Sequence, residues 1–446
     1  MGTIWNPAIE TMPRDRLRAL QEERLRWSVA HAYARVSFYR QRLDAAGIRP
    51  SDIQTLDDLP KLPFTTKTDL RDNYPFGLFA VPMDQIARVH ASSGTRGKLT
   101  VVGYTKNDLA VWGEVVARAI CLAGGRPGDL IHNAYGYGLF TGGLGLHLGA
   151  ETLGATVVPM GGGNTPRQVM LIRDFAARGL CCTPSYALTI AEECERQGLD
   201  TKTLPLAYGI FGAEPWTDAL RDEIERRLNI VATDIYGLSE VIGPGVANEN
   251  ADVKYGLHIA EDHFYPEIID PDTGEVLPPG EWGELVFTSL TKEAFPNLRY
   301  RTGDITMLID EPSPCGRTNR RMARLRGRHD DMLIIRGVNV YPSEVESVLL
   351  ALDEIAPFYQ LILAREGPLD TLEVQAEVTE EFCVGCHTPS GDLDPDHPRL
   401  RALHDRIADQ LRTRLGLGTT ITLLAPNTLT RIEVGKAVRV IDRRGG

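Results

Sequence analysis

The sequence predicts an α/β protein with a large N-terminal domain and a small C-terminal α+β domain. Between residues 105 and 236, short apolar runs typical of strands alternate with longer segments at helical spacing. This alternation favours a mostly parallel sheet that is covered by helices. After residue 255 the apolar runs are short and are separated by turns such as Asp-Pro-Asp-Thr-Gly at 270–274, which indicates an antiparallel section.

Local signals place the elements of the large domain in order. Apolar residues at helical spacing predict a helix over 14–45. Thr105 and Asp108 resemble a capping box that opens a helix, and the glycines at 124 and 125 end it. The elements expected next are strand 130–132, a glycine-rich helix, strand 155–158, helix 165–179, strand 180–183, a helix to 198, strand 206–211, a helix from 217 and strand 231–236.

A change of pattern near residues 326–330 predicts the domain boundary. We expect an N-terminal domain of residues 1–328 and a C-terminal domain of residues 329–446. The elements expected in the small domain are strand 332–336, a helix from 343, strands near 359 and 372, and a helix over 400–414. The glycine, proline and aspartate residues of 383–398 predict a surface loop.

Composition and charge argue against several classes of protein. The formal net charge is −12 and no basic run stands out, so we expect no nucleic-acid partner. No apolar run approaches the roughly 20 residues that span a membrane, and no signal-peptide pattern opens the chain, so we expect a cytoplasmic protein without a membrane partner. The sequence leaves the oligomeric state open, with a homodimer among the options.

Seven scattered cysteines predict reduced thiols rather than a disulfide framework. Residues 383–387, Cys-Val-Gly-Cys-His, match a haem-attachment motif or half of a zinc site. Haem attachment of that type requires export, and zinc would need a further ligand such as His397. The role of Cys383, Cys386 and His387 is therefore left open.

Residues 92–98, Ser-Ser-Gly-Thr-Arg-Gly-Lys, lie between two strand-like runs. Glycines allow a sharp turn whose N–H groups can surround a phosphate, and the hydroxyls and Lys98 add donors and positive charge. The segment is not a Walker A loop, because Ser92 stands at the first glycine position and Leu99 follows the lysine. It indicates phosphate binding in another fold, and the alternative is a polar surface turn.

Further motifs follow in a characteristic order. They are Tyr-Gly-Leu-Ser-Glu at 236–240, Tyr-Arg-Thr-Gly-Asp at 300–304, Gly-Arg-His-Asp-Asp at 327–331 and Gly-Lys at 435–436. With the loop at 92–98, this set resembles the adenylate-forming superfamily. Four longer segments resemble its phenylacetate–CoA ligase family, namely YGYGLFTGG at 135–143, FGAEPW at 211–216, GPGVANE at 243–249 and GLHIAEDHFYPE at 256–267.

The resemblance implies an acid–thiol ligase that forms AMP. Such an enzyme activates an aromatic acid (phenylacetate, benzoate or a substituted aryl acid) with ATP to an acyl-adenylate, expels pyrophosphate, and transfers the acyl group to coenzyme A. The implied cofactors are ATP, Mg²⁺ and coenzyme A. Because an anionic carboxylate must approach an anionic α-phosphate, a cationic side chain and a metal ion are expected at the site.

The resemblance also assigns nucleotide-binding residues. They are Ser92, Ser93, Gly94, Thr95, Gly97, Lys98, Gly212, Ala213, Glu214, Asp234, Tyr236, Gly237, Ser239, Asp304 and Arg328. In the family pattern the segment ending at Glu214 lies against adenine, and Asp304 accepts both ribose hydroxyls with help from Arg328. The expected catalytic residues are Lys98, Glu240 and Lys436.

Glu240 would hold Mg²⁺, a hard ion that carboxylate oxygens suit. Lys436 would bridge the acid carboxylate and the α-phosphate. Without the family context, Glu240 and Asp304 read as solvated turn residues and Lys436 reads as a lysine of a flexible tail.

Flat and apolar side chains are expected to bind the aryl ring. The candidates are Tyr135, Tyr137, Gly138, Ile235, Tyr236, Ile242 and Pro244, with core packing as the alternative for each. By resemblance, the small domain is mobile and rotates about Asp330 between the two steps, bringing Arg336, Gly337 and Tyr341 to coenzyme A. The alternative is that Asp330 belongs to a plain linker.

The chain departs from the family pattern at several positions. Arg96 and Leu99 replace Thr and Pro that the family loop often carries, which puts the phosphate contacts in doubt. Some members resemble zinc carriers, but here only His258 and Cys315 remain of that ligand set. Two ligands are too few for a closed four-coordinate site, which argues against zinc.

Two other functions stay open at this stage. One is a stand-alone enzyme that adenylates an aminobenzoate or hydroxybenzoate and passes it to a carrier protein, amine or hydroxyl. The other is a non-catalytic nucleotide-binding regulator, against which the retained Lys98, Glu240, Asp304 and Lys436 argue.

Overall fold

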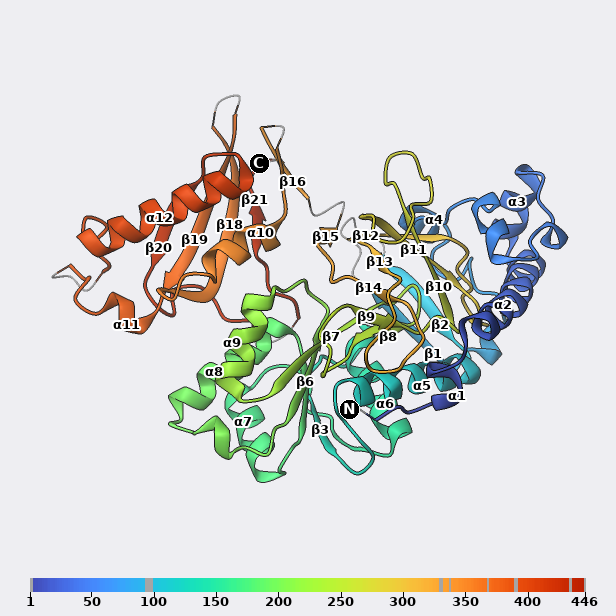
Figure 1. Ribbon diagram of the computed structural model, residues 1–446, viewed down its shortest axis with the longest axis horizontal. Helices are drawn as coiled ribbons and strands as arrows, with labels where there is room; N and C mark the ends of the chain where they lie inside the picture. Colours follow the sequence, from blue (N-terminus) through green and yellow to red (C-terminus); the bar gives the residue numbers. More distant parts are fainter. Residues whose placement is uncertain are drawn as a thin grey trace.

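A computed structural model describes residues 3–92, 99–328, 332–336, 338–366, 369–388, 392–432 and 435–444. The chain forms a large N-terminal domain and a small C-terminal domain, which confirms the predicted α/β class (Figure 1). The predicted boundary between residues 328 and 329 falls at the edge of a described range and stays a prediction.

The large domain is built around a nine-stranded sheet in the order β13-β14-β9-β8-β7-β6-β5-β3-β4. The strands from β4 to β7 are parallel, as predicted. They are β3 (Leu130–Asn133), β4 (Thr156–Val158), β5 (Gly179–Cys182), β6 (Tyr208–Gly212) and β7 (Val231–Leu238). Beyond β7 the neighbours are antiparallel, namely β8 (Gly243–Glu249), β9 (Leu257–Ile259), β13 (Leu308–Ile309) and β14 (Arg321–Met322).

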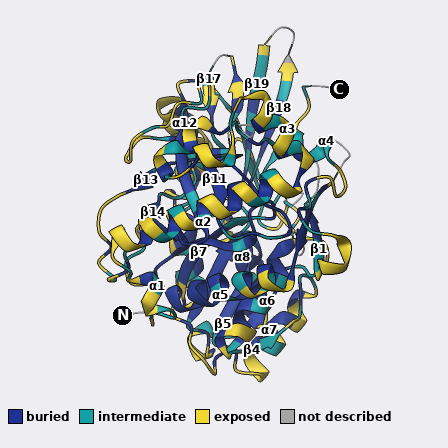
Figure 2. Ribbon diagram, turned by 90° about the vertical axis from the view of Figure 1, so that its right-hand side faces the viewer, coloured by how far each residue is buried: buried dark blue, intermediate teal, exposed yellow. Residues whose placement is uncertain are grey.

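Helices cover both faces of the parallel strands. Successive strand residues point to opposite faces, so Leu180 and Cys182 join one core cluster while Cys181 joins the other. The cluster with Cys181 contains α5 (Lys106–Leu122) and α6 (Thr141–Leu153), and the other contains α7 (Thr165–Asp174), α8 (Pro184–Arg196) and α9 (Asp218–Leu228). The outward faces of α7 and α9 carry exposed residues, whereas α5 is buried along most of its length (Figure 2).

A second, antiparallel sheet and the N-terminal helices complete the large domain. The sheet has the order β10 (Phe264–Ile269), β11 (Gly283–Ser289), β12 (Tyr300–Thr306) and β15 (Gly327–Arg328). A separate hairpin joins β1 (Arg88–Ser92) to β2 (Thr100–Tyr104). The remaining helices are α1 (Pro7–Glu10), α2 (Arg14–Arg35), α3 (Ser37–Ala45), α4 (Lys67–Asp72) and short 3₁₀ turns at Pro50–Asp52, Leu56–Lys61, Met83–Gln85 and Thr201–Thr203.

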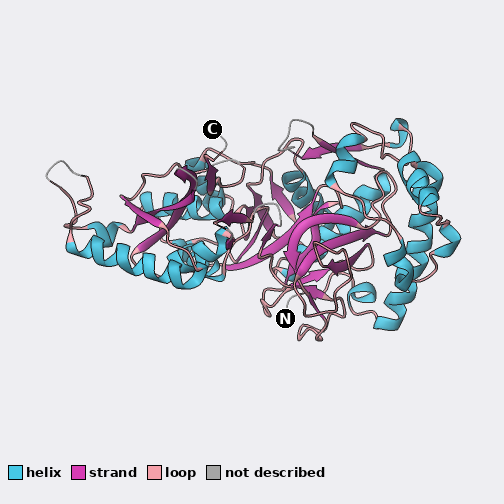
Figure 3. Ribbon diagram, turned by 90° about the horizontal axis from the view of Figure 1, so that it is seen from above, coloured by secondary structure: helices cyan, strands magenta, loops and turns pink. Residues whose placement is uncertain are grey.

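The small domain has its own sheet with helices beside it (Figure 3), and it has its own hydrophobic core. Its sheet has the order β20 (Thr420–Leu424), β19 (Leu369–Val378), β18 (Ile355–Glu366) and β21 (Val440–Asp442), and the hairpin of β16 (Leu333–Ile335) and β17 (Val338–Val340) precedes it. The helices are α10 (Pro342–Leu349), α11 (Glu380–Cys383) and α12 (Pro398–Leu415). Within the described ranges, no helix combines the length and apolar character that crossing a bilayer requires.

Three local predictions are wrong in detail. The helix expected over 14–45 is interrupted at Val36, whose backbone is extended, and the Arg40 guanidinium donates to the carbonyls of Tyr33 and Ala34 that the interruption frees. The helix expected to reach residue 179 ends at Asp174. There Ala176, with φ of 56°, takes the left-handed position that is usually occupied by glycine, so no local residue pattern marks the end of this helix.

The third correction concerns residues 383–398, which were expected to form a surface loop. Cys383 closes α11, and both Cys383 and Cys386 are buried in the core of the small domain. The chain folds back there, with the Asp394 N–H donating to the carbonyl of Cys386. A run of polar and turn-forming residues therefore concealed two core positions.

Glycines allow α5 and α6 to pack closely. A Cβ atom added at Gly149 would lie 2.1 Å from Cγ1 of Val116, and one added at Gly145 would lie 2.5 Å from the Trp112 ring. We predict that Gly149→Leu lowers the free energy of unfolding by about 1–3 kcal/mol or more, because overpacking forces the helices apart.

Chemical denaturation would measure this loss. Glu151→Leu, on the exposed side of the same helix, serves as the control and is expected to stay within about 0.5 kcal/mol of the wild type. Equal stability of the two variants would contradict the close packing of α5 on α6.

Candidate active site

A cavity of about 440 Å³ lies where the two domains meet. It collects most of the predicted site residues that the structure describes. Those on its wall are Ser92, Tyr135, Ala213, Glu214, Asp234, Ile235, Tyr236, Gly237, Ser239, Glu240, Pro244, Asp304, Arg328 and Lys436. These residues come from both domains and are up to 344 positions apart in the sequence (92 to 436), so the fold alone brings them together.

Two parallel strands place much of this wall. Ala213 and Glu214 directly follow β6, while Tyr236 and Gly237 belong to the end of β7 and Glu240 follows it. The carboxyl ends of neighbouring parallel strands meet at one edge of a sheet, which is where ligands bind in folds of this kind. Ala213 has φ of 71°, a left-handed conformation that turns the chain sharply after β6.

One carboxylate is fixed at the second sheet. The hydroxyl of Tyr236 donates to Oδ2 of Asp304 over 2.6 Å, and Nη1 of Arg328 lies 3.8 Å from Oδ1. Asp304 and Arg328 are register partners on β12 and β15. Burial raises the pKa of Tyr236 well above its usual range, so this hydroxyl keeps its proton and remains a donor.

The turn that carries Glu240 is held in place by hydrogen bonds to its backbone carbonyls. The four consecutive carbonyls of residues 239–242 each accept a hydrogen bond from a buried side chain. Tyr104 donates to Ile242 over 2.9 Å and to Ser239 over 3.4 Å. The Asn297 amide donates to Glu240, and the Lys292 ammonium donates to Val241 over 3.0 Å.

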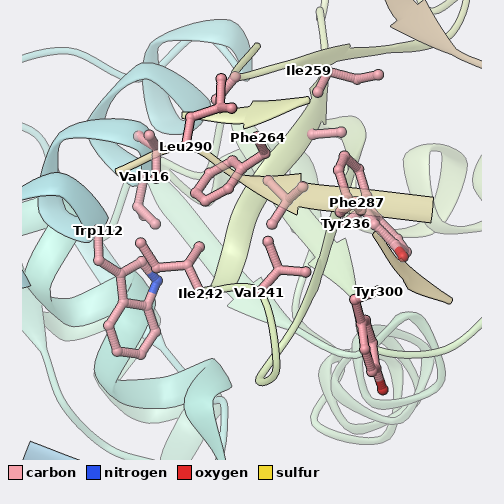
Figure 4. Close-up of a cluster of buried hydrophobic side chains, with 14 of the residues drawn as sticks. Trp112, Val116, Tyr236, Val241, Ile242, Ile259, Phe264, Phe287, Leu290 and Tyr300 are labelled. Atoms are coloured by element: carbon pink, nitrogen blue, oxygen red, sulfur yellow. The ribbon is translucent and has the colours of Figure 1, made fainter. Parts of the chain in front are cut away.

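Lys292 is a buried cation beneath this turn. Its Nζ lies 4.5 Å from the centre of the Tyr104 ring, and that ring stacks on Trp112 at 4.9 Å. Burial lowers the pKa of Lys292 to about 8, against the opposing effect of the Asp108 and Glu240 carboxylates. Figure 4 shows Val241 and Ile242 among the buried apolar and aromatic side chains around this turn. Sequence reasoning missed Lys292, since its burial leaves no local signal.

The residues on the wall around Glu240 suit a hard cation. Glu240 is 6% exposed, and the hydroxyls of Ser239 and Thr141 lie 3.1 Å apart on the same wall. Mg²⁺ prefers one or two carboxylates combined with oxygens of the substrate phosphates, so the donor types present fit this ion.

Only some of the residues predicted to bind the aryl ring lie on the cavity wall. Tyr135, Ile235 and Pro244 lie on the wall, and further wall residues that the sequence did not single out are Lys67, Phe140, Thr141, Gly142, Leu146, Trp216, Leu257, Met322, Arg324 and Leu325. Most of these come from α6 and from the segments near β9 and β14, which only the tertiary fold brings to the site.

Four predicted residues are placed elsewhere. Gly212, Tyr137, Gly138 and Ile242 are not part of the cavity wall. The Tyr137 hydroxyl accepts a hydrogen bond from Asn133 over 2.8 Å and lies 3.1 Å from His147, so it belongs to a local polar network. Ile242 packs in the core (Figure 4).

Part of the prediction lies outside the described residues, namely Ser93, Gly94, Thr95, Gly97, Lys98, Asp330 and Gly337. The strands that flank the 92–98 loop are described, and Ser92 and Thr100 at their ends have buried hydroxyls with no partner in the described part of the chain. Such hydroxyls leave donors and acceptors for a bound group.

The predicted coenzyme A residues take two positions. Tyr341 lies on a second interdomain cavity of about 370 Å³. Arg336 is outside both cavity walls, and its Nε donates to the carbonyl of Asp370 over 2.8 Å.

His258 and Cys315, the two residues that remain of the possible zinc ligand set, lie close together. His258 Nε2 lies 2.9 Å from Ser313 Oγ and 3.4 Å from Cys315 Sγ, and burial lowers the pKa of His258 to about 3. In the described ranges, no three His, Cys, Asp or Glu residues come together as a metal-binding group. The prediction against zinc stays a prediction. All seven cysteines are free, and all except Cys315 are buried.

Known proteins resemble the chain over nearly its full length. The family model described as AMP-binding enzyme matches residues 13–291, and the model described as AMP-binding enzyme C-terminal domain matches residues 337–444. A phenylacetate-coenzyme A ligase of Thermus thermophilus is 58% identical, with 99% of this chain and 100% of that protein covered.

Two solved structures of a 2-hydroxyisobutyryl-CoA ligase also match, each covering 98% of this chain and 92% of that one at 30% identity. The structure in the postadenylation state with an acyl-AMP has a TM-score of 0.91. The structure in the thioesterification state with the acyl-AMP and CoA has a TM-score of 0.71.

The buried charge of Lys292 generates a prediction on pH dependence. Its pKa in the folded chain, about 8, lies below the ordinary lysine value of 10.5. As pH rises through this interval, the folded state releases the proton before the unfolded state, so the unfolded state binds more protons and the free energy of unfolding increases. We predict that wild type gains stability relative to Lys292→Met between pH 8 and 10.5.

Urea denaturation at several pH values would measure the difference between the two proteins. Lys106→Met, an exposed substitution at the start of α5, should show a difference from wild type that does not change with pH. A pH-independent difference for Lys292→Met would contradict the buried charge.

Proposed function

Because the chain belongs to the phenylacetate–coenzyme A ligase family of AMP-binding enzymes, we propose that it joins phenylacetate or a related aromatic acid to coenzyme A. ATP first converts the acid into an acyl-adenylate with loss of pyrophosphate, and the thiol then displaces AMP. The observation that carries this proposal is the interdomain cavity, which combines a carboxylate pair, an apolar end and a lysine of the small domain.

The nucleotide end of the cavity is assigned to AMP. Asp304, oriented by Tyr236 and close to Arg328, offers carboxylate oxygens to the two ribose hydroxyls. The wall after β6, including Ala213 and Trp216, provides flat surface for adenine.

The phosphate end is assigned to Ser92 and the loop that follows it, together with Glu240. Ser92 brings a buried hydroxyl without a described partner, and the held turn fixes the direction in which Glu240 points. A Mg²⁺ ion held by Glu240 and the phosphates would supply the positive charge that offsets the repulsion between the carboxylate and ATP.

In the first step, an oxygen of the aryl acid attacks the α-phosphorus of ATP. The bond from that phosphorus to the bridging oxygen breaks, and pyrophosphate leaves. Tyr135, Ile235 and Phe140 contribute apolar wall that can orient the ring, while Lys436, on the same wall, brings a positive charge to the point where the two anions meet.

In the second step, the sulfur of coenzyme A attacks the acyl carbon. A C–S bond forms, the C–O bond to AMP breaks, and the thiol loses its proton. We assign this step to another orientation of the small domain, with residues 1–328 and 329–446 as the two bodies, Asp330 as the hinge and Arg336, Gly337 and Tyr341 facing coenzyme A. The TM-scores support this assignment, since the chain resembles a postadenylation arrangement more than a thioesterification one.

Substrate and acceptor can be tested together. We predict ATP–pyrophosphate exchange that depends on an aromatic acid, with phenylacetate among the best substrates of a panel. Net turnover to AMP should require coenzyme A. Exchange with an aminobenzoate or hydroxybenzoate alone, and no thioester with coenzyme A, would favour the stand-alone adenylating enzyme instead.

Lys436 tests the division into two steps. Lys436→Ala should reduce adenylate formation by about 10²–10³ in rate, because one electrostatic contact to the transition state is lost. The same variant should still convert a supplied acyl-adenylate and coenzyme A into the thioester. Lys106→Ala, an exposed lysine away from the cavity, is the control. Equal losses in both half-reactions would contradict the assigned role.

A further inference from the structure

Two glutamates join the domains in a reciprocal way. Glu214 of the large domain accepts the N–H of Ala437 of the small domain with Oε2, over 3.0 Å. Glu346 of the small domain accepts the N–H of Thr217 of the large domain with Oε1, also over 3.0 Å. Each domain therefore offers one carboxylate to the backbone of the other.

Helix geometry explains why carboxylates occupy these positions. The second oxygen of Glu214 accepts the N–H of Ser185 over 2.7 Å, in the first turn of α8. Thr217 is the residue at the start of α9. The first N–H groups of a helix have no partner inside the helix and carry partial positive charge, so a carboxylate stabilises them.

Arg439 lies beside the carboxylate of Glu346. It lies 3.5 Å from Oε2 of Glu346, and its guanidinium covers the Tyr359 ring at 4.4 Å. The nearby charges of Glu346 and Glu214 help to raise the pKa of Arg439 against the effect of its burial. The Tyr359 hydroxyl donates to the same Oε2 over 3.0 Å, which leaves Oε1 directed to the large domain.

These contacts flank Lys436 closely. Ala437 is the next residue in the chain, and Arg439 is three residues beyond Lys436. Glu346 is 2% exposed and lies on the second interdomain cavity but not on the wall that carries Lys436. It can therefore affect the lysine only by way of the segment 437–439 and the domain interface.

We propose that Glu346, with Glu214 and Arg439, positions Lys436 for adenylate formation and is released when the small domain takes its other orientation. The inference rests on the two-step function proposed above. Both N–H contacts cross the interface, so a rotation of the small domain breaks them. Loss of these contacts should slow the step that needs Lys436 in the cavity and spare the step that does not.

The interface offers a matched control. Arg431 of the small domain pairs with Glu192 of the large domain at 2.9 Å, and with Glu377 of its own domain at the same distance. This ion pair crosses the same interface, but it involves neither residues 436–439 nor the wall of the first cavity. Glu192→Gln therefore weakens the interface without disturbing the Lys436 segment.

The test compares half-reactions in the full-length protein. Glu346→Gln keeps the shape of the side chain but removes the charge that faces Arg439. We expect it to slow phenylacetate-dependent ATP–pyrophosphate exchange about tenfold, the scale of one charge-assisted hydrogen bond. Conversion of supplied phenylacetyl-adenylate and coenzyme A to the thioester should stay within about twofold, and Glu192→Gln should leave both rates within about twofold of wild type.

A second, milder variant distinguishes a positioning role of Glu346 from a general loss of folding. Tyr359→Phe removes only the hydroxyl that orients Glu346 and should cause a smaller loss in the same direction. Unchanged exchange in Glu346→Gln, or equal losses in both half-reactions, would overturn the positioning role. Absence of both half-reactions in the wild type would instead refute the proposed function, so the two failures are distinguishable.

Discussion

The turn between β7 and β8 is the constraint on which the site depends. At this turn the nine-stranded sheet changes from parallel to antiparallel. Buried carbonyls cannot be left without donors, and Tyr104, Lys292 and Asn297 supply them from three directions. Glu240 therefore projects from a turn whose carbonyls are hydrogen-bonded to buried side chains, while Tyr236 and Pro244, on either side of this turn, belong to the cavity wall.

The proposed mechanism assigns rigidity and mobility to different parts of the molecule. The large domain fixes the carboxylates through the sheet, whereas the small domain brings Lys436 to the cavity wall, and the next residue, Ala437, donates its N–H to Glu214 across the interface. A reaction in two steps favours one fixed domain and one that moves, because each step needs different groups beside the same substrate. In the proposed mechanism the wall of the large domain stays in place, while rotation of the small domain exchanges Lys436 for the residues assigned to coenzyme A.

Local patterns in the sequence predicted a good deal of this arrangement. Alternating runs indicated the parallel strands, and Glu240 follows the end of β7, whereas Asp304 lies inside β12. The sequence pattern could not show which buried side chains support the turn that carries Glu240. Lys292 and Asn297 lie more than fifty residues from Glu240, and a lysine in a mixed run gives no sign of burial. The Val36 break and the Ala176 helix end escaped because neither uses glycine or proline.

The interface was equally invisible in the sequence. Glu346 sits in an ordinary amphipathic helix, and only the packed domains bring it to the N–H of Thr217. Phe140, Leu257 and Met322 likewise reach the cavity wall from separate elements, so neighbouring sequence carries no information on their meeting. Tyr137, by contrast, was expected at the site for its flat ring, but its hydroxyl belongs to a local polar network with Asn133 and His147.

The burial of the Cys181 and Cys182 thiols has a chemical consequence. Burial raises the pKa of Cys181 and Cys182, which lie on β5, well above the ordinary thiol value. At neutral pH these sulfurs are therefore protonated and poorly nucleophilic. An enzyme that holds a mixed anhydride must keep its own side chains from intercepting it, and burial keeps the thiols of Cys181 and Cys182 in their unreactive form.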